Sequence, residues 1–346
     1  MYAGLLRLAR ILFSKERSLQ ILHPTPNPSP SSCRRHAFGM LGGGRIWCRP
    51  KFCGYITLAA ATSSLFACTS AALAADKDPP VPPGRDPGGI AIAIIGPGLD
   101  YTLPQISEHL ARDGEGEIIG WDFVDDDRRP FESGIQMDRL FCPTFATFAE
   151  DLIHSEARHS RVVPVRVAGT DALQLGRAAA YVGQSPAKIA LVIVASSRAE
   201  DWNLFRKAAE HYSDVLFIAA PIETPSAVQK PNRNVDNDPI YPVSLGIENI
   251  LSVTDLVPSS KAAVGPATID IAGGCHYFWN NENFCPGMPH VCAATNIAAL
   301  ASRIVAKEPE LKGKALKDRI LSFAAPLPEV SKSGKIEQPW YLYPDY

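Results

Sequence analysis

The stretch Ile90-Ala91-Ile92-Ala93-Ile94-Ile95 is an unbroken apolar run, which Gly96-Pro97-Gly98 brings to an end. A continuous apolar run of this length, rich in β-branched isoleucine, is typical of a strand that is buried on both faces. Strands with two buried faces occur in parallel sheets that helices cover on both sides. The stretch therefore predicts an α/β fold with a central parallel sheet.

Strand and helix patterns alternate along the rest of the chain. Strands are predicted at residues 162–167, 189–195, 215–220, 250–254 and 268–272, and helices at residues 103–112, 144–157, 171–182, 200–212, 289–307 and 312–323. Alternation at this spacing indicates repeated βαβ units, which build a parallel sheet with helices on both faces. We expect one doubly wound α/β domain.

The composition is typical of a water-soluble globular protein, with 46% hydrophobic residues, 20% charged residues and a formal net charge of -2. Because the charges are balanced and no long basic run lies outside the N-terminal region, we expect no nucleic-acid partner.

Four segments spread over most of the chain carry related motifs. Residues 92–100 read Ile-Ala-Ile-Ile-Gly-Pro-Gly-Leu-Asp, residues 141–146 read Phe-Cys-Pro-Thr-Phe-Ala, residues 216–222 end in Ala-Ala-Pro-Ile, and residues 283–291 read Asn-Phe-Cys-Pro-Gly-Met-Pro-His-Val. In this order they resemble Val-Ala-Val-Ile-Asp-Thr-Gly-Ile-Asp, Gly-His-Gly-Thr-His-Val-Ala, Ala-Ala-Gly-Asn and Gly-Thr-Ser-Met-Ala-Ala-Pro-His-Val of the subtilisin-like serine peptidases, or subtilases. The resemblance runs from about Ile90 to Phe323 and implies a subtilisin-like doubly wound fold.

At each position where that family carries a catalytic group, this chain has a different residue. The aspartate, histidine and serine positions correspond to Gly96, Cys142 and Cys285, and the asparagine that donates to the oxyanion corresponds to Ile222. The family mechanism needs a nucleophile, a base that takes its proton and an acid that orients the base. The resemblance therefore implies a peptidase fold whose triad and oxyanion positions are all replaced.

Cys285 offers one route to activity, because it precedes a predicted helix whose positive end lowers a thiol pKa. A cysteine nucleophile still needs a base within hydrogen-bond reach, and Cys142 occupies the base position. We interpret His154 and His159 as surface residues and His290 as a structural residue of the last long helix.

Four cysteines follow the N-terminal region, namely Cys142, Cys275, Cys285 and Cys292. In an oxidising compartment Cys275 and Cys285 could close a loop of about ten residues, which stabilises by roughly 2–3 kcal/mol, with Cys292 a buried helix residue. The alternatives are a bridge between Cys142 and Cys285 across the former active site, and free buried thiols.

Two sequence patterns are weak indications of a nucleotide site and of a calcium site. Gly96-Pro97-Gly98 begins like a dinucleotide fingerprint, but its third glycine falls on Tyr101 and Pro97 has no backbone donor for a phosphate. Residues 125–127 are three aspartates, which suit either a calcium site or, as we favour, a solvated acidic turn. We therefore expect no cofactor and no metal site.

The N-terminal region resembles an export signal. A basic cluster at residues 45–51 precedes a mostly apolar stretch at residues 55–73, and Ala72-Leu73-Ala74 follows the small-residue pattern of a cleavage site. Translation would begin at Met1 or Met40. The alternatives are a membrane anchor and a lipoprotein signal ending at Cys68.

These observations divide the chain into four parts: an N-terminal extension and secretory signal at 1–75, a Pro-rich linker at 76–89, a subtilase-like domain at 90–325 and a C-terminal tail at 326–346. We expect an exported pseudopeptidase, periplasmic or extracellular, that binds a peptide or protein in the former substrate groove and has no stable membrane span once the signal is removed. The alternative is an active subtilase-family endopeptidase with non-standard catalytic residues.

Overall fold

A computed structural model describes residues 78–137, 140–222, 233–255, 263–274 and 288–324, all within one compact unit. Their centre is a seven-stranded sheet in the order β2-β5-β1-β6-β7-β8-β9, and all its strand pairs are parallel. The strands are β1 (Ile90–Gly96), β2 (Trp121–Asp122), β5 (Ser160–Arg166), β6 (Ile189–Val192), β7 (Leu216–Ala219), β8 (Ile250–Asp255) and β9 (Ile271–Gly273). A separate antiparallel pair joins β3 (Ile135–Met137) to β4 (Leu140–Cys142).

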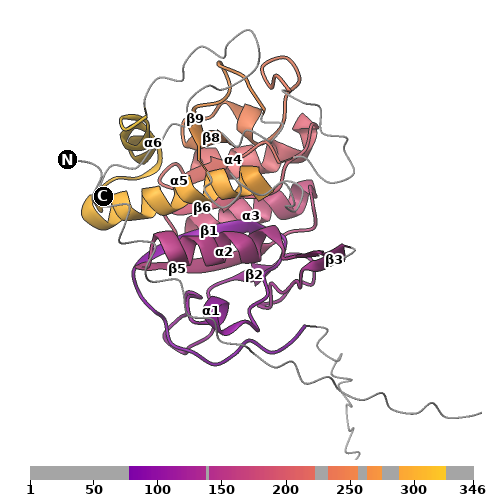
Figure 1. The fold of residues 1–346 in the computed structure, drawn as a ribbon, viewed down its shortest axis with the longest axis vertical. Coiled ribbons are helices and arrows are strands. Elements are labelled where there is room, and N and C mark those ends of the chain that lie inside the picture. The colour runs from indigo at the N-terminus through magenta and orange to yellow at the C-terminus, as the bar shows by residue number, and fades with distance from the viewer. Residues whose placement is uncertain (1–77, 138–139, 223–232, 256–262, 275–287, 325–346) are drawn as a thin grey trace, which may run out of the picture. The chain divides into compact units, whose positions relative to one another are not determined.

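Helices connect and cover these strands. They are α1 (Pro104–Ser107), α2 (Phe145–Glu156), α3 (Ala172–Gln184), α4 (Asn203–His211), α5 (Met288–Lys307) and α6 (Gly313–Leu321), with short 3₁₀ turns η1 (Ala199–Trp202) and η2 (Val243–Leu245). Helices α2 and α5 pack against each other across the front of the sheet in Figure 1, while α3 packs against α4. The predicted doubly wound α/β architecture is confirmed.

Strand β1 lies inside the sheet because it has no polar face. Its residues Ile92 to Ile95 are at most 1% exposed, and they pair with β5 on one side and β6 on the other. The apolar run in the sequence therefore forms the strand that was predicted from it, with hydrogen-bonded neighbours along both edges.

The predicted helix at residues 103–112 is shorter in the structure, where α1 ends at Ser107. The reason is tertiary pairing. Val162 donates its backbone N–H to the His109 carbonyl, and Ala111 donates to the Val162 carbonyl, which draws this segment alongside β5. Contacts with a distant strand thus override the local helical pattern.

The Pro-rich segment expected as a linker lies against the domain in its described part. The Tyr101 hydroxyl donates to the Pro79 carbonyl at 2.7 Å, and Arg112 Nη2 donates to the Pro82 carbonyl at 2.9 Å. Asp86 accepts hydrogen bonds from the backbone of Arg112 and from the Arg161 side chain. Residues 78–89 are therefore an extended arm attached to the domain surface.

Within these described ranges, no helix combines the length and apolar character needed to cross a membrane.

Candidate functional site

A pocket of about 350 Å³ lies where four neighbouring strands of the sheet end. Its walls come from the residues that follow β1, β5, β6 and β7, including Pro97, Val167 to Thr170, Ile193 to Ala195, and Ile222. In open α/β sheets, ligands bind beyond the carboxyl ends of the strands. Its position makes this pocket the candidate functional site.

Gly96, which the sequence resemblance aligns with the aspartate position of the subtilases, is the last residue of β1. A β carbon at this residue would lie 2.4 Å from Cγ1 and 2.9 Å from Cδ1 of Ile193. Real β carbons do not approach other atoms this closely, so Ile193 occupies the space that an acidic side chain would need. Ile193 itself is buried and forms part of the pocket wall.

Cys142, which the sequence resemblance aligns with the histidine position, lies at the end of β4, just before α2. It is buried, packs against Met288 at the start of α5, and takes part in a disulfide. A disulfide sulfur has no proton to exchange, so Cys142 cannot act as a general base. Phe145, the first residue of α2, lines the pocket.

Ile222 follows β7 and lines the pocket with an apolar side chain that is 3% exposed. Its backbone N–H donates to the Ala220 carbonyl at 2.8 Å. The Ile222 side chain has no hydrogen-bond donor, and its backbone N–H is already bonded. Ile222 therefore cannot donate a hydrogen bond to an oxyanion in the pocket. Ile222 and Pro97, the neighbour of Gly96, thus line one cavity together with Phe145, which is three residues after Cys142.

The other two predicted cysteines, Cys275 and Cys285, fall outside the described residues, and so does the expected bond between them. Cys292 is buried on α5, as expected for a helix residue, and it also takes part in a disulfide.

Arg166, the last residue of β5, is one of two charged residues in the pocket wall, the other being Glu132. Its Nη1 donates to Asp122 Oδ2 at 2.8 Å and to Asp125 Oδ2 at 2.9 Å, and its Nε lies 3.6 Å from Glu132 Oε2. Burial works to lower the pKa of Arg166, but the hydrogen bond and charge of Asp122 raise it. The guanidinium is therefore held as a cation among carboxylates.

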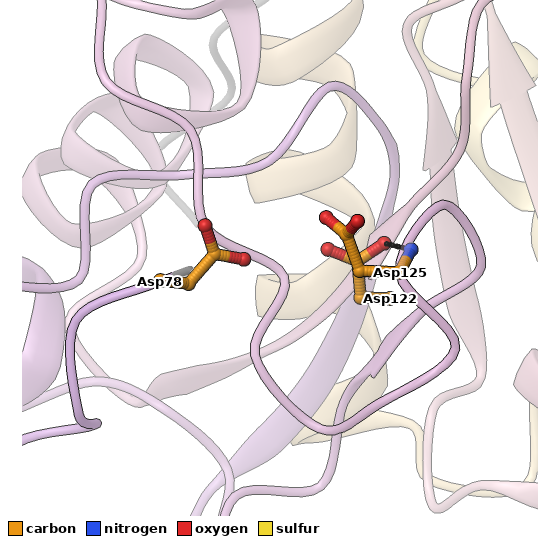
Figure 2. A group of neighbouring side chains, drawn as sticks. All are labelled: Asp78, Asp122 and Asp125. Carbon is orange, nitrogen blue, oxygen red and sulfur yellow. Dashed lines mark hydrogen bonds between the residues drawn. The ribbon is translucent and has the colours of Figure 1, made fainter. Parts of the chain in front are cut away.

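Asp78, Asp122 and Asp125 form a cluster in which one carboxylate oxygen of each lies within 4.8 Å of the others. In Figure 2, Asp78 faces Asp122 and Asp125 from the opposite side of the group. Burial, together with the neighbouring aspartates, raises the pKa of Asp78 despite the nearby Arg166. Since Arg166 already supplies the compensating positive charge, the cluster is explained by ion pairing.

The three aspartates at residues 125–127 have different partners. Asp125 pairs with Arg166, Asp126 pairs with Arg177 at 3.0 Å, and Asp127 accepts from the backbone of Arg129. The three neighbouring carboxylates therefore point to separate partners.

His290 and Asp255 form a pair that the sequence patterns did not reveal. His290 Nδ1, in the first turn of α5, lies 2.5 Å from Asp255 Oδ2 at the end of β8, and both side chains are buried. His290 had been interpreted as structural and Asp255 had not been singled out. The available signal was the position of Asp255 directly after an apolar strand, where functional residues of α/β folds lie.

No family model and no curated protein matches the sequence. Among solved structures, a cold-adapted subtilisin-like serine proteinase is similar with a TM-score of 0.52 and 15% identity, over 72% of this chain and 88% of that chain. The nisin leader peptidase NisP from Lactococcus lactis is similar with a TM-score of 0.51 and 13% identity, over 73% of this chain and 86% of that chain. Identity this low establishes the fold and leaves activity to the site itself. The chain has a subtilisin-like fold.

Proposed function

We propose that this chain is an exported, catalytically inactive protein of subtilisin-like fold that binds a peptide or protein segment in the pocket at the carboxyl edge of its sheet. One observation carries the proposal. The pocket is open, yet Gly96, Cys142 and Ile222 present no acid, base or oxyanion donor around it.

Without these groups, acyl transfer should be very slow. Losing one oxyanion donor lowers the rate by about 10²–10³. Losing the nucleophile and its base removes most of the remaining catalysis, because these groups act as a unit. Ile193 also fills the space beside Gly96, so an acidic side chain at Gly96 would not fit without repacking of the wall.

The pocket itself supports binding. Its walls are largely apolar, including Val124, Phe145 and Ile222, while Arg166 and Glu132 supply polar groups. Pockets with this mixture bind an apolar group and orient it by a few polar contacts. An extended peptide can add backbone hydrogen bonds along a strand edge, and this does not require catalytic residues.

Selection from a phage-displayed random peptide library tests the binding. We expect enriched peptides that share an apolar position, and Thr170→Trp at the pocket wall should weaken their binding at least tenfold. The matched control is Thr268→Trp, another half-buried threonine that lines a separate hollow near η2 and α6. Failure to enrich any peptide, or equal binding by both variants, would refute the proposed site.

The paired His290 and Asp255 favour a second candidate, an active endopeptidase with non-standard residues. An aspartate that contacts imidazole Nδ1 can orient the ring as a general base. In this case purified protein would cleave casein, and His290→Gln and Cys285→Ala would each abolish the cleavage. Under the first proposal casein stays intact and both substitutions leave that result unchanged.

Export rests on the Ala72-Leu73-Ala74 site and on the oxidised state of Cys142 and Cys292. Disulfides persist in oxidising compartments and are rare in the cytosol. We therefore place the protein in the periplasm or outside the cell, either released after cleavage or held by lipid at Cys68.

A further inference from the structure

We propose that the pocket at the carboxyl edge of the sheet selects peptides in which a lysine or arginine neighbours an apolar residue, and that Glu132 pairs with the basic side chain. This inference rests on the proposed function, because it names the kind of peptide that the same pocket takes. The two charged residues of the pocket wall, Arg166 and Glu132, differ in how far their charges are already compensated.

The positive charge of Arg166 is already compensated. Its Nη1 donates to carboxylate oxygens of Asp122 and Asp125 at 2.8 Å and 2.9 Å, and its side chain is only 15% exposed. Asp122 is fully buried, so this ion pair is shielded from solvent. A carboxylate of a peptide would have to compete with two carboxylates that are already in place. Arg166 is therefore a poor partner for an acidic ligand.

The negative charge of Glu132 is more accessible. Its side chain is 44% exposed, and its Oε2 lies 3.6 Å from Arg166 Nε and accepts from the Gly98 backbone at 3.4 Å. Both contacts are longer than the roughly 2.7–2.9 Å of a charge-assisted hydrogen bond. Glu132 Oε1 has no hydrogen-bond partner among the residues that the structure describes. A cationic side chain in the pocket can therefore bind this oxygen while Oε2 keeps its contacts.

The backbone of Glu132 is held at the pocket by a close approach to Gly98. A β carbon at Gly98 would lie 2.5 Å from the Phe131 carbonyl carbon and 2.6 Å from the Glu132 nitrogen. The Glu132 N–H donates to the Leu99 carbonyl at 3.3 Å, and the Leu99 N–H donates to the Pro130 carbonyl at 3.0 Å. Because a glycine at position 98 lets the two segments meet, the loop after β1 positions a carboxylate from 34 residues further along the chain.

The surroundings of Arg166 add further negative charge. Four aspartates influence one another there, namely Asp78, Asp122, Asp125 and Asp127. Arg129 contributes a second positive charge, because it lowers the pKa of Tyr101, which Asp78, Asp122 and Asp127 raise. With Glu132, five carboxylates thus lie near two guanidinium groups. A cleft with a surplus of one charge attracts ligands of the opposite charge, so this region favours a cationic peptide.

The apolar part of the wall sets a second requirement. Val124, Phe145, Ile193 and Ile222 line the pocket, which has a volume of about 350 Å³. An apolar side chain of the peptide can be buried against them, and the aliphatic stem of a neighbouring lysine or arginine can lie on apolar surface while its charged end reaches Glu132. An acidic residue at the same place would be repelled by Glu132, which gives selectivity against acidic peptides.

Selection of phage-displayed random peptides on the full chain, on Glu132→Gln and on Glu132→Lys tests the selectivity. We expect lysine or arginine to be enriched next to the shared apolar residue. This enrichment should disappear with Glu132→Gln and be replaced by aspartate or glutamate with Glu132→Lys. The matched control is Glu248→Gln, at an exposed glutamate that lines the separate hollow near η2 and α6, and it should keep the basic enrichment.

A measurement on the unsubstituted protein guards against variants that fail to fold. The most enriched peptide is labelled, and its affinity is measured by fluorescence polarisation. Replacing its basic residue by glutamine should weaken binding about three- to tenfold, the effect of a partly exposed ion pair. Raising NaCl from about 0.05 M to about 1 M should also weaken binding, because salt screens the pair.

The outcomes separate this inference from the proposed function on which it rests. Enriched peptides without a basic residue, basic enrichment that persists with Glu132→Gln, or an affinity unchanged by the glutamine replacement or by salt would each overturn the inference and leave the peptide pocket standing. Failure to enrich any peptide would overturn both.

Discussion

Ile193 packs against the backbone of Gly96 so closely that a β carbon at Gly96 would lie 2.4 Å from Ile193 Cγ1. If Gly96 corresponds to the aspartate position of the subtilases, as the resemblance implies, Ile193 fills the space that the acidic side chain would need. Under the proposed function, restoring the four family residues alone should therefore not be enough for activity.

This contact predicts what happens when the subtilase residues are restored at the four positions. The combined substitutions Gly96→Asp, Cys142→His, Ile222→Asn and Cys285→Ser should give little or no cleavage of a fluorogenic peptide. Adding Ile193→Ala should raise the rate, because the aspartate side chain then has room. The control is Ile193→Ala alone, which should remain inactive. Equal rates for the four-fold and five-fold variants would show that Ile193 is not the obstacle.

The N-cap of α2 should be important for stability. The Thr144 hydroxyl accepts from the Thr147 backbone at 3.1 Å, and Thr147 Oγ1 accepts from the Asp100 backbone at 2.9 Å, which ties the helix to the loop after β1. Thr144→Ala should lower the free energy of unfolding by about 0.5–2 kcal/mol. Urea denaturation measures the change, and Thr144→Ser should retain most of the stability. Equal losses in both variants would point to packing of the methyl group instead.

Asp86 holds the N-terminal arm to the domain. Partial burial works to raise its pKa, but hydrogen bonds from the Arg112 and Gly88 backbones and from Arg161 lower it below the ordinary value of 3.8. A lowered folded-state pKa stabilises the protein above the unfolded-state pKa, and this stabilisation is lost as the pH falls through the folded-state value. Asp86→Asn should cost about 1–2 kcal/mol at pH 7.

Urea denaturation at pH 7 and at successively lower pH below 3.8 tests this dependence. The difference between Asp86→Asn and the unsubstituted protein should shrink with acid. Asp214→Asn, at an exposed ion pair with Lys312, should have little effect at any pH. A difference for Asp86→Asn that stays constant with pH would contradict the argument.

Removal of the signal should leave Ala75 or Asp76 as the mature N-terminus. The Ala72-Leu73-Ala74 pattern offers small side chains at the positions that a signal peptidase contacts. N-terminal sequencing of the exported protein provides the measurement. Protein that still begins at Met1 or Met40 would be inconsistent with cleavage, and a lipid on Cys68 would identify a lipoprotein.

Peptide mapping under non-reducing conditions should recover Cys275 linked to Cys285. Their short separation makes closure of the loop favourable, with a stabilisation of roughly 2–3 kcal/mol. The competing result is a peptide that links Cys285 to Cys142, whose sulfur is already in a disulfide in the structure. Recovery of that second peptide would replace the local pairing with a bridge across the former active site.

Much of the fold follows from local patterns. The apolar run at residues 90–95 becomes β1, and the amphipathic segment at residues 144–157 becomes α2 over Phe145–Glu156. Ile222, one of the positions singled out by the motifs, lines the pocket at the carboxyl edge of the sheet. These features can be predicted because the spacing of apolar residues indicates which residues are buried, and the order of the motifs gives the order of the elements along the chain.

The sequence alone therefore determined a parallel α/β domain. Only the tertiary structure decided which distant side chains touch: Ile193 over Gly96, Asp255 against His290, and His109 beside Glu150. It also shortened α1, because Val162 draws the following residues into pairing with β5. Periodicity records that a residue is buried, but the identity of its partner depends on how strands and helices far apart in the chain are brought together.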